Sequence, residues 1–165
     1  FEDGGAAHGA LLVGADGVRS RVRAHLFGDE APVFTGHVAY RALVPTADCG
    51  GLGELPFTSG LAITPGRNLG WYTIRDGALI NVVALVQSGE WAEEGWSVPS
   101  DVGTVLRLFA DAHPEFLRIL RAAPAGGVFR WGLFTHAPLA RYSSSRVALL
   151  GDAAHPMLPF MGQGA

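Results

Sequence analysis

The chain has 165 residues and a net charge of −3, with 48% hydrophobic and 16% charged residues. This composition is that of a globular and not a disordered chain, and the length is sufficient for one domain with a hydrophobic core. There is no basic block typical of nucleic-acid binding, no apolar run of the ~20 residues that cross a bilayer, and no signal-peptide pattern. We therefore expect neither a nucleic-acid nor a membrane partner, and a cytoplasmic location.

The cysteine and histidine residues bear on whether the protein contains a disulfide or a metal site. The single Cys49 excludes an internal disulfide and a cysteine-rich metal site. The six histidines, which include the unassigned His37 and His136, show no spacing of metal ligands. We expect no metal.

The first predicted elements are a strand and a helix. The apolar run 10–13 predicts a short buried strand. A helix follows, ended by Gly28. Its apolar face would consist of Val18, Val22 and Leu26. We interpret Arg19 and Arg21 as a solvated part of the helix surface.

From residue 33 to residue 86 the hydrophobic pattern changes to a period of two, which predicts strands joined by tight turns. Asp76-Gly77 is typical of a hairpin turn. The predicted strands cover residues 38–43, 61–63, 70–75 and 79–86. Such closely spaced strands indicate an antiparallel sheet.

The next stretch predicts helices. Residues 90–100 are expected to form a loop, after which Ser100 or Asp101 can cap a helix. A second helix is predicted over 115–121, and a strand over 128–134. The charged residues of the helices are interpreted as a solvated surface, namely Asp111, Glu115 and Arg118.

The last stretch carries the strongest pattern. Residues 147–150 predict a buried strand, Gly151 allows a sharp turn, and Asp152 lies just past the carboxyl end of the strand, where open α/β sheets bind ligands. A carboxylate there can accept hydrogen bonds from the hydroxyls of a ribose or ribityl chain. Residues 162–164 look like the start of a helix, whose free amides favour an anion.

Two segments together carry a family resemblance. LLVGADGVRSRVR resembles the DG motif of the single-component FAD-dependent aromatic hydroxylases, with Asp16, Gly17, Ser20 and Arg23 at the family's intervals. GDAAHPMLPFMGQGA resembles the GD motif, most closely that of the salicylate hydroxylase branch. Both motifs occur in the order that the family shows.

The resemblance implies a fold and a domain organisation. The fold class would be mixed α/β: a partial FAD-binding, Rossmann-like parallel sheet with an inserted antiparallel substrate-side sheet and helices. Residues 1–30 would belong to the FAD-binding domain, 31–140 to the substrate-binding part, and 141–165 to the return of the FAD-binding domain. The chain starts with Phe1 and shows no Gly-x-Gly-x-x-Gly turn after a strand. We therefore expect an internal fragment of a longer enzyme.

The resemblance also implies the contacts of FAD. Asp16 would order its loop, Gly17 would let the backbone approach the cofactor, and Arg23 would hold the motif together or lie near phosphate. Asp152 would bind ribityl or ribose hydroxyls, and Pro159 would lie against the isoalloxazine. The pyrophosphate or the flavin N1–C2=O edge would face the last residues, Gly162, Gln163, Gly164 and Ala165. His155 is expected to be a packed, hydrogen-bonded residue of the turn.

On the substrate side the resemblance is weaker. Tyr72 aligns with a catalytic and substrate-binding tyrosine of the family, although it could also be a sheet aromatic with its hydroxyl at the rim. Asn68 stands where histidine is common and Thr73 where proline is common. Since asparagine takes no proton at neutral pH, the base that would deprotonate a phenol is not identified. Arg41 could bind a substrate carboxylate or form a structural ion pair.

The implied activity is hydroxylation of a phenolic substrate with NADH or NADPH and O₂, through a flavin C4a-hydroperoxide. Three alternatives stay open: a related flavin epoxidase, a halogenase or a reductase with the same cofactor fold. A further alternative is a truncated chain that binds no cofactor on its own. The sequence does not fix the oligomeric state.

Overall fold

The computed structural model describes residues 2–28, 30–50, 58–91, 93, 95 and 97–161. The fold is mixed α/β, as the sequence indicated. Residues 36–133 form one compact unit, and residues 1–35 with 134–165 form another. No helix in the described ranges is long and apolar enough to cross a membrane.

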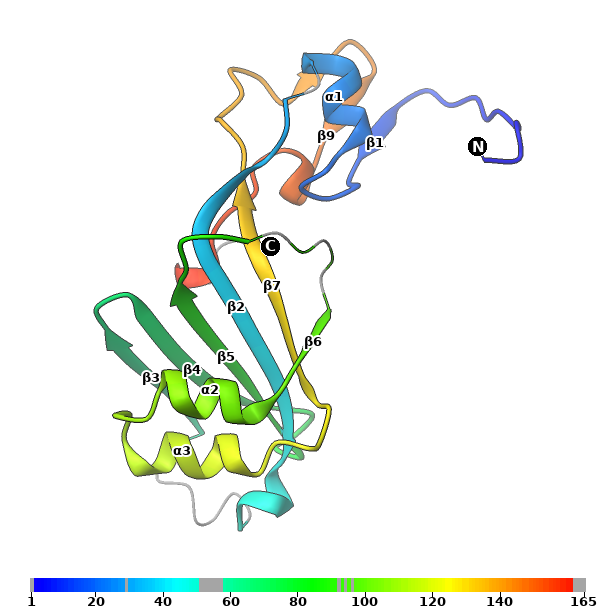
Figure 1. The fold of residues 1–165 in the computed structure, drawn as a ribbon. Coiled ribbons are helices and arrows are strands. Elements are labelled where there is room, and N and C mark those ends of the chain that lie inside the picture. The colour runs from blue at the N-terminus through cyan, green and yellow to red at the C-terminus, as the bar shows by residue number, and fades with distance from the viewer. Residues whose placement is uncertain are drawn as a thin grey trace. The chain divides into compact units, whose positions relative to one another are not determined.

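The unit of residues 36–133 is built on an antiparallel sheet (Figure 1). Its strand order is β3-β4-β5-β2-β7-β6, so chain neighbours β3, β4 and β5 pair as a meander. The strands are β2 (Val33–Pro45), β3 (Ser59–Thr64), β4 (Arg67–Ile74), β5 (Leu79–Gln87), β6 (Val98–Ser100) and β7 (Val128–Thr135). The hairpin predicted at Asp76-Gly77 is present, with positive φ at both residues.

Two helices, α2 (Val102–Leu108) and α3 (Pro114–Arg121), lie across one face of this sheet (Figure 1). Asp101 caps α2 by accepting a hydrogen bond from the Thr104 amide at 2.9 Å. Hydrogen bonds from Thr104, first from its hydroxyl, lower the pKa of Asp101. Pro114 suits the first position of α3, where no amide donor is needed.

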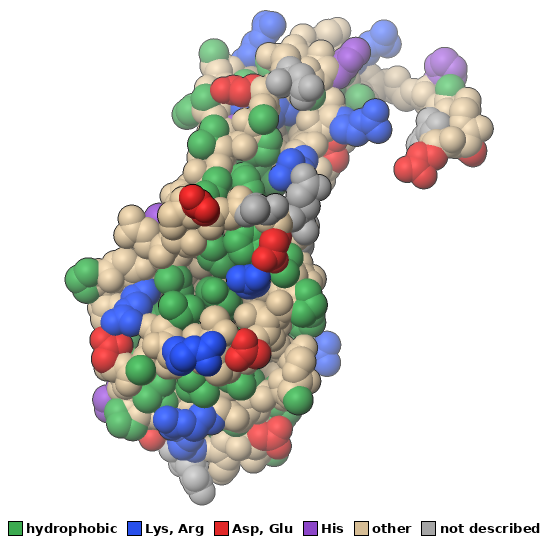
Figure 2. Space-filling model, viewed as in Figure 1, with side chains coloured by type: hydrophobic (Ala, Val, Ile, Leu, Met, Phe, Trp, Pro, Cys, Tyr) green, Lys and Arg blue, Asp and Glu red, His purple; other side chains and the backbone are tan. Residues whose placement is uncertain are grey.

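The alternation of β2 and β5 decides which side chains those helices cover. Tyr40, Ala42, Val82 and Ala84 point to the helical side, where Val105 and Leu120 pack against them. Burial of this apolar set is the main stabilising term of the unit. Figure 2 shows arginine and acidic side chains interspersed with hydrophobic ones over α2 and α3. Asp111 is exposed as expected, but Glu115 and Arg118 are half-buried and form an ion pair with each other, so they are not simply a solvated surface.

The other unit contains a three-stranded sheet in the order β1-β9-β8. β1 and β9 are parallel, and β8 pairs antiparallel with β9. The elements are β1 (Leu12–Gly14), α1 (Arg21–Phe27), β8 (Ser143–Ser144), β9 (Val147–Leu149) and the 3₁₀ turns η3 (Gly151–Ala153) and η4 (Pro159–Met161).

Gly14 sets how closely α1 approaches this sheet. A Cβ at Gly14 would lie 2.7 Å from Val22 Cβ and 2.9 Å from Leu149 Cδ2. Only glycine therefore fits between the helix and β9. Leu149, Ala153 and Ala154 form a small core on which Val22 and Leu26 pack.

Four predictions about these elements were wrong. The buried strand predicted at 147–150 ends at Leu149, and Leu150 is 60% exposed. The strand at 10–13 was expected to be buried, but Leu11, Leu12 and Val13 are 61%, 53% and 49% exposed, because β1 pairs only with β9 among the described strands. The helix begins at Arg21 rather than at Val18, since Ser20 caps it. The loop at 90–100 ends in the short strand β6, which pairs with β7.

Candidate functional site: two turns at one sheet edge and an open sheet face

The two motif turns leave the same edge of the small sheet. β1 and β9 run parallel with Gly14 opposite Leu149, so the turn after each strand starts at the carboxyl end. Asp16-Gly17 follows the first strand and Gly151-Asp152 follows the second. Ligands of open α/β sheets bind at this kind of edge.

Asp16 orders the first of these turns. Its carboxylate accepts hydrogen bonds from the Ser20 hydroxyl at 2.5 Å and from the amides of Arg21 and Val22 at 2.8 and 3.3 Å. Partial desolvation raises the pKa of this exposed carboxyl, but the hydrogen bonds outweigh it and the net pKa lies below the ordinary value. The carboxylate thus caps the start of α1.

Arg23 connects the two turns. The side chain is buried, with 4% exposed. Its Nη1 donates to the carbonyl oxygens of Ala153 and Ala154 at 3.3 and 3.0 Å, and its Nη2 donates to Ala137 O at 2.8 Å. Ala153 and Ala154 lie 130 and 131 residues away in the chain. Arg23 therefore holds the second turn against the first helix.

The glycines of the two turns leave their backbone atoms accessible to a ligand. Gly17 and Gly151 have φ of +80° and +59°, and a Cβ at either would meet no described atom within 4 Å. The half-buried Asp152, in η3, has no hydrogen-bond or ion-pair partner among the described residues. A ligand could approach this backbone closely and use the free carboxylate.

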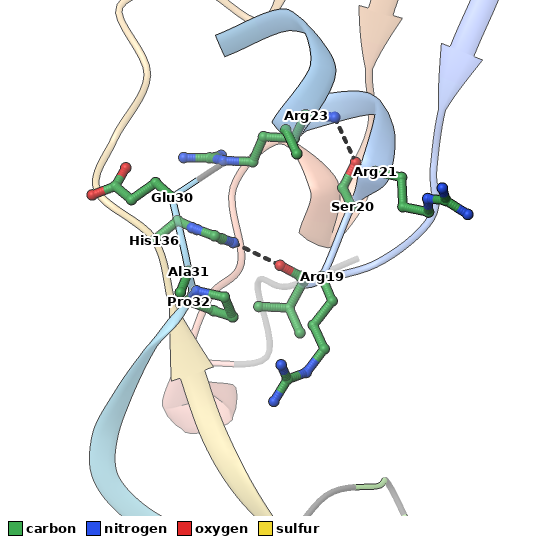
Figure 3. A pocket seen from close by; sticks show the side chains of 10 residues that line it. Arg19, Ser20, Arg21, Arg23, Glu30, Ala31, Pro32 and His136 are labelled. Carbon is green, nitrogen blue, oxygen red and sulfur yellow. Dashed lines mark hydrogen bonds between the residues drawn. The ribbon is translucent and has the colours of Figure 1, made fainter. Parts of the chain in front are cut away.

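A pocket of about 200 Å³ lies beside the first turn (Figure 3). Three arginines, Arg19, Arg21 and Arg23, contribute to its lining, together with Glu30 and His136. The His136 ring is buried, with Nε2 2.6 Å from Val18 O. Its Nδ1 is buried without a hydrogen-bond partner among the described residues.

Arg19 and Arg21 are exposed, as expected. Arg19 also lies over the Phe134 ring, with its Cζ 5.5 Å from the ring centroid. The prediction for His155 was wrong. The ring is exposed and contacts Tyr142 edge-on at 6.0 Å, with no side-chain hydrogen bond to a described residue, since the turn directs it outward. Pro159 begins η4.

The last predicted cofactor residues fall beyond the described ranges. Gly162, Gln163, Gly164 and Ala165 lie outside the described residues.

The sheet of residues 36–133 has a second face that α2 and α3 do not cover. Register places Arg41, Leu43, Asn81 and Tyr72 on it, since Leu43 pairs with Asn81 and Asn81 pairs with Tyr72. Tyr72 is 48% and Leu43 42% exposed. The face is therefore partly open. The predicted residues Arg41 and Tyr72 share this face. Asn68 also lies on it, because it is four residues before Tyr72 on the same strand.

A shallow groove of about 550 Å³ lies on this face. Its lining includes the side chains of Arg41, Leu43, Phe129 and Trp131. A volume of this order is typical of small-molecule sites, and mostly apolar walls with few polar groups are typical as well.

Arg41 forms no ion pair with a described residue, although a structural ion pair was one of its two predicted roles. Its Nε donates to Asn81 Oδ1 at 2.7 Å, so its partner is a neutral amide. Asn81 is 1% exposed, and its Nδ2 is buried with no hydrogen-bond partner among the described residues. A buried donor left unpaired costs on the order of 1–3 kcal/mol.

Asn81 was not among the predicted site residues, and His136 had no predicted role. A signal for Asn81 exists, because it is the only amide within the apolar run of residues 79–86. Nothing local marks His136, whose contact with Val18 O spans 118 residues.

The folds that resemble this chain are those of salicylate hydroxylase-like FAD enzymes. A salicylate hydroxylase substrate complex matches 98% of the chain with a TM-score of 0.79 and 29% identity. Klebsiella pneumoniae HpxO complexed with FAD and uric acid matches 99% with a TM-score of 0.79 and 27% identity. These structures are covered over 43% and 41% of their own chains.

The curated relatives are aromatic-ring monooxygenases, so the resemblance carried by the two motifs is confirmed. 3-Amino-4-hydroxybenzoate 2-monooxygenase PtmB3 of Streptomyces platensis is 36% identical over the whole chain. 6-Hydroxynicotinate 3-monooxygenase of Bordetella bronchiseptica is 38% identical, again over the whole chain. The chain spans 41% and 43% of the length of these two relatives. No family model matches.

Proposed function

We propose that this chain is part of an FAD-dependent monooxygenase that hydroxylates a small aromatic acid with NADH or NADPH and O₂. The observation that carries the proposal is the joining of the two motif turns by Arg23. Its three hydrogen bonds to backbone carbonyls hold both turns at one sheet edge. That arrangement suits a long, anionic dinucleotide.

The residues present fit FAD. Gly17 and Gly151 offer bare backbone, and Asp152 offers a carboxylate without a described partner, which suits a hydroxylated chain. When bound, FAD would supply both the oxidation of NAD(P)H and the activation of O₂. Pro159 and the residues 162–165 remain proposed contacts of the flavin.

The pocket beside the first turn suits a phosphate-bearing co-substrate. Arg19 and Arg21 bring positive charge to its rim, and guanidinium groups bind phosphate oxygens well. We place the approach of NAD(P)H at this pocket. We also propose a cytoplasmic location for the protein.

The open sheet face would hold the aromatic acid. Its apolar groove would keep water from the ring, Arg41 would bind the carboxylate, and Tyr72 would contact the phenol. Both relatives are named for substrates with a ring carboxylate, a hydroxybenzoate and a hydroxynicotinate, which supports an aromatic acid as the substrate. Asn68 cannot serve as the base, so the residue that accepts the phenolic proton is not assigned.

The test uses the full-length protein that contains this chain. We expect it to purify with bound flavin and to oxidise NAD(P)H faster when hydroxybenzoates or hydroxynicotinates are added, with a hydroxylated product identified by mass spectrometry. NAD(P)H oxidation without a hydroxylated product across the panel would instead favour a reductase, an epoxidase or a halogenase.

A variant of the full-length protein tests whether Asp152 contacts the cofactor. Asp152→Ala removes the proposed acceptor of ribityl or ribose hydroxyls and should lower flavin occupancy, measured as the ratio of flavin to protein absorbance. A variant with normal flavin content would show that Asp152 does not contact the cofactor. Asp111→Ala, an exposed carboxylate on the other unit, is the control.

A further inference from the structure

Asn81 stands out in its strand. It is a fully buried polar side chain, 1% exposed, within the apolar strand β5. Its cross-strand neighbours are Tyr72 on β4 and Leu43 on β2. Arg41 lies two residues before Leu43 on β2, opposite Val83, so the Arg41 side chain reaches Asn81 diagonally across the sheet.

The bond between the two side chains fixes both. Because Arg41 Nε–H can only donate, the atom that it meets at 2.7 Å must be the Asn81 oxygen. Nδ2 of Asn81 is then directed elsewhere, and it has no hydrogen-bond partner among the described residues. The amide is half satisfied, with one donor group still to be used.

The same bond leaves the charge of Arg41 uncompensated. Neither Nη group of Arg41 has a partner among the described residues. Three other arginines of this unit, Arg67, Arg118 and Arg130, each form an ion pair with a carboxylate. A guanidinium held through Nε still presents its two Nη groups, which match the two oxygens of a carboxylate.

We propose that Asn81 is a positioning residue for substrate recognition: it holds Arg41 so that its Nη groups bind the carboxylate of an aromatic acid in the groove of Leu43, Phe129 and Trp131. The inference rests on the proposed function and deepens it by selecting aromatic carboxylates over neutral aromatics. A carboxylate in place of Asn81 would neutralise Arg41, and an apolar residue would release it.

The first arm of the test measures binding to the full-length holoenzyme by titration calorimetry. The probes are 3-hydroxybenzoate and its neutral analogue 3-hydroxybenzamide. Wild type should bind the benzoate more tightly. Asn81→Leu should raise the Kd of the benzoate about tenfold, since a lost charge-assisted contact corresponds to about one decade of affinity. The Kd of the benzamide should change less than twofold.

A double-mutant cycle separates positioning from packing. Arg41→Met should weaken benzoate binding at least as much as Asn81→Leu, and the double variant should bind no more weakly than Arg41→Met alone. If Asn81→Leu does not fold, Asn81→Asp keeps the side-chain shape and should weaken only the benzoate. Arg67→Met, on the opposite face of the sheet and paired with Asp111, is the matched control and should leave the preference unchanged.

Each outcome of these binding measurements either supports the positioning role of Asn81 or contradicts it. Equal weakening of both probes, or additive effects in the cycle, would show a merely structural Asn81 and overturn the inference. A wild type with no preference for the benzoate would overturn it as well. If the binding pattern is as expected but no aromatic acid is hydroxylated, the proposed activity fails and the recognition role of Asn81 stands.

Discussion

Arg23 makes contacts that no other described arginine makes, because all its side-chain hydrogen bonds go to backbone carbonyls. Removing the side chain leaves these buried acceptors unpaired. We expect Arg23→Met to lower the free energy of unfolding by about 2–4 kcal/mol. Thermal unfolding with and without added FAD would measure the loss.

The control for Arg23 lies two residues away. Arg21, on the same helix, is exposed and its side chain has no described partner. Arg21→Met should change the free energy of unfolding by no more than about 0.5 kcal/mol. Similar losses in both variants would mean that the buried hydrogen bonds of Arg23 contribute nothing of their own.

Asp16 gives a prediction that depends on pH. Its pKa is lowered in the folded state, so its contribution to stability is present above the unfolded-state pKa of about 3.9 and is lost as pH falls through the lower folded value. Because the group is exposed, that contribution is at most about 1 kcal/mol. Asp16→Asn should therefore destabilise the protein at pH 7 and have little effect below about pH 3.

Urea unfolding of wild type and Asp16→Asn at several pH values would test this dependence. A difference between the two proteins that stays constant down to the lowest pH would show that the charge of Asp16 plays no part. Ser20→Ala, which removes one donor to the same carboxylate, should shift the pH profile in the same direction by a smaller amount.

At the scale of elements, β1 and α1 pack through Gly14. A methyl group there would lie within 3 Å of Val22 and Leu149. We expect Gly14→Ala to cost about 1–3 kcal/mol of stability, the usual cost of overpacking, as measured by chemical denaturation. Adding Val22→Ala should recover part of the loss by making room.

Gly9→Ala is the matched control for this packing. A Cβ at Gly9 would meet only Leu11 O at 3.5 Å, and Gly9 does not have a positive φ. It should have little effect on stability. A Gly14→Ala variant as stable as this control would mean that α1 can move away from β9 at little cost.

The elements also show how far the sequence alone could lead. The antiparallel meander, the Asp101 cap and the end of α1 at Gly28 depend on neighbours within a few residues, and the local pattern predicts them. The partners of Arg23 lie more than a hundred residues away, so no local pattern contains them. The exposure of β1 depends on which strands lie beside it, which hydrophobicity alone does not state.

Some features of the candidate site could likewise be predicted from the sequence, and others could not. Arg41 was identified by its residue type and Tyr72 by its alignment with the family's tyrosine, and strand alternation brings them to one face. The link between them and Asn81 follows from sheet register, which the sequence did not provide. Of the two roles predicted for Arg41, the ion pair is not found among the described residues, because the uncharged Asn81 occupies the diagonal position.

At the scale of the whole molecule, we expect the 165-residue chain alone to hold FAD weakly or not at all. It contains no Gly-x-Gly-x-x-Gly turn after a strand, and it spans about two fifths of the relatives' length. Purification followed by an absorbance spectrum checks this. A stoichiometric yellow complex would show that the two turns joined by Arg23 suffice to retain the cofactor.

The position of Arg23 has a consequence for protein engineering. Arg23 and the three carbonyls that it binds all lie outside residues 36–133. A chimera that exchanges residues 36–133 for the corresponding segment of a relative would therefore inherit these hydrogen bonds unchanged. Recombination between relatives could then vary the Arg41, Tyr72 and Asn81 face while keeping the paired turns, so that new substrate preferences could arise by exchange of one contiguous segment.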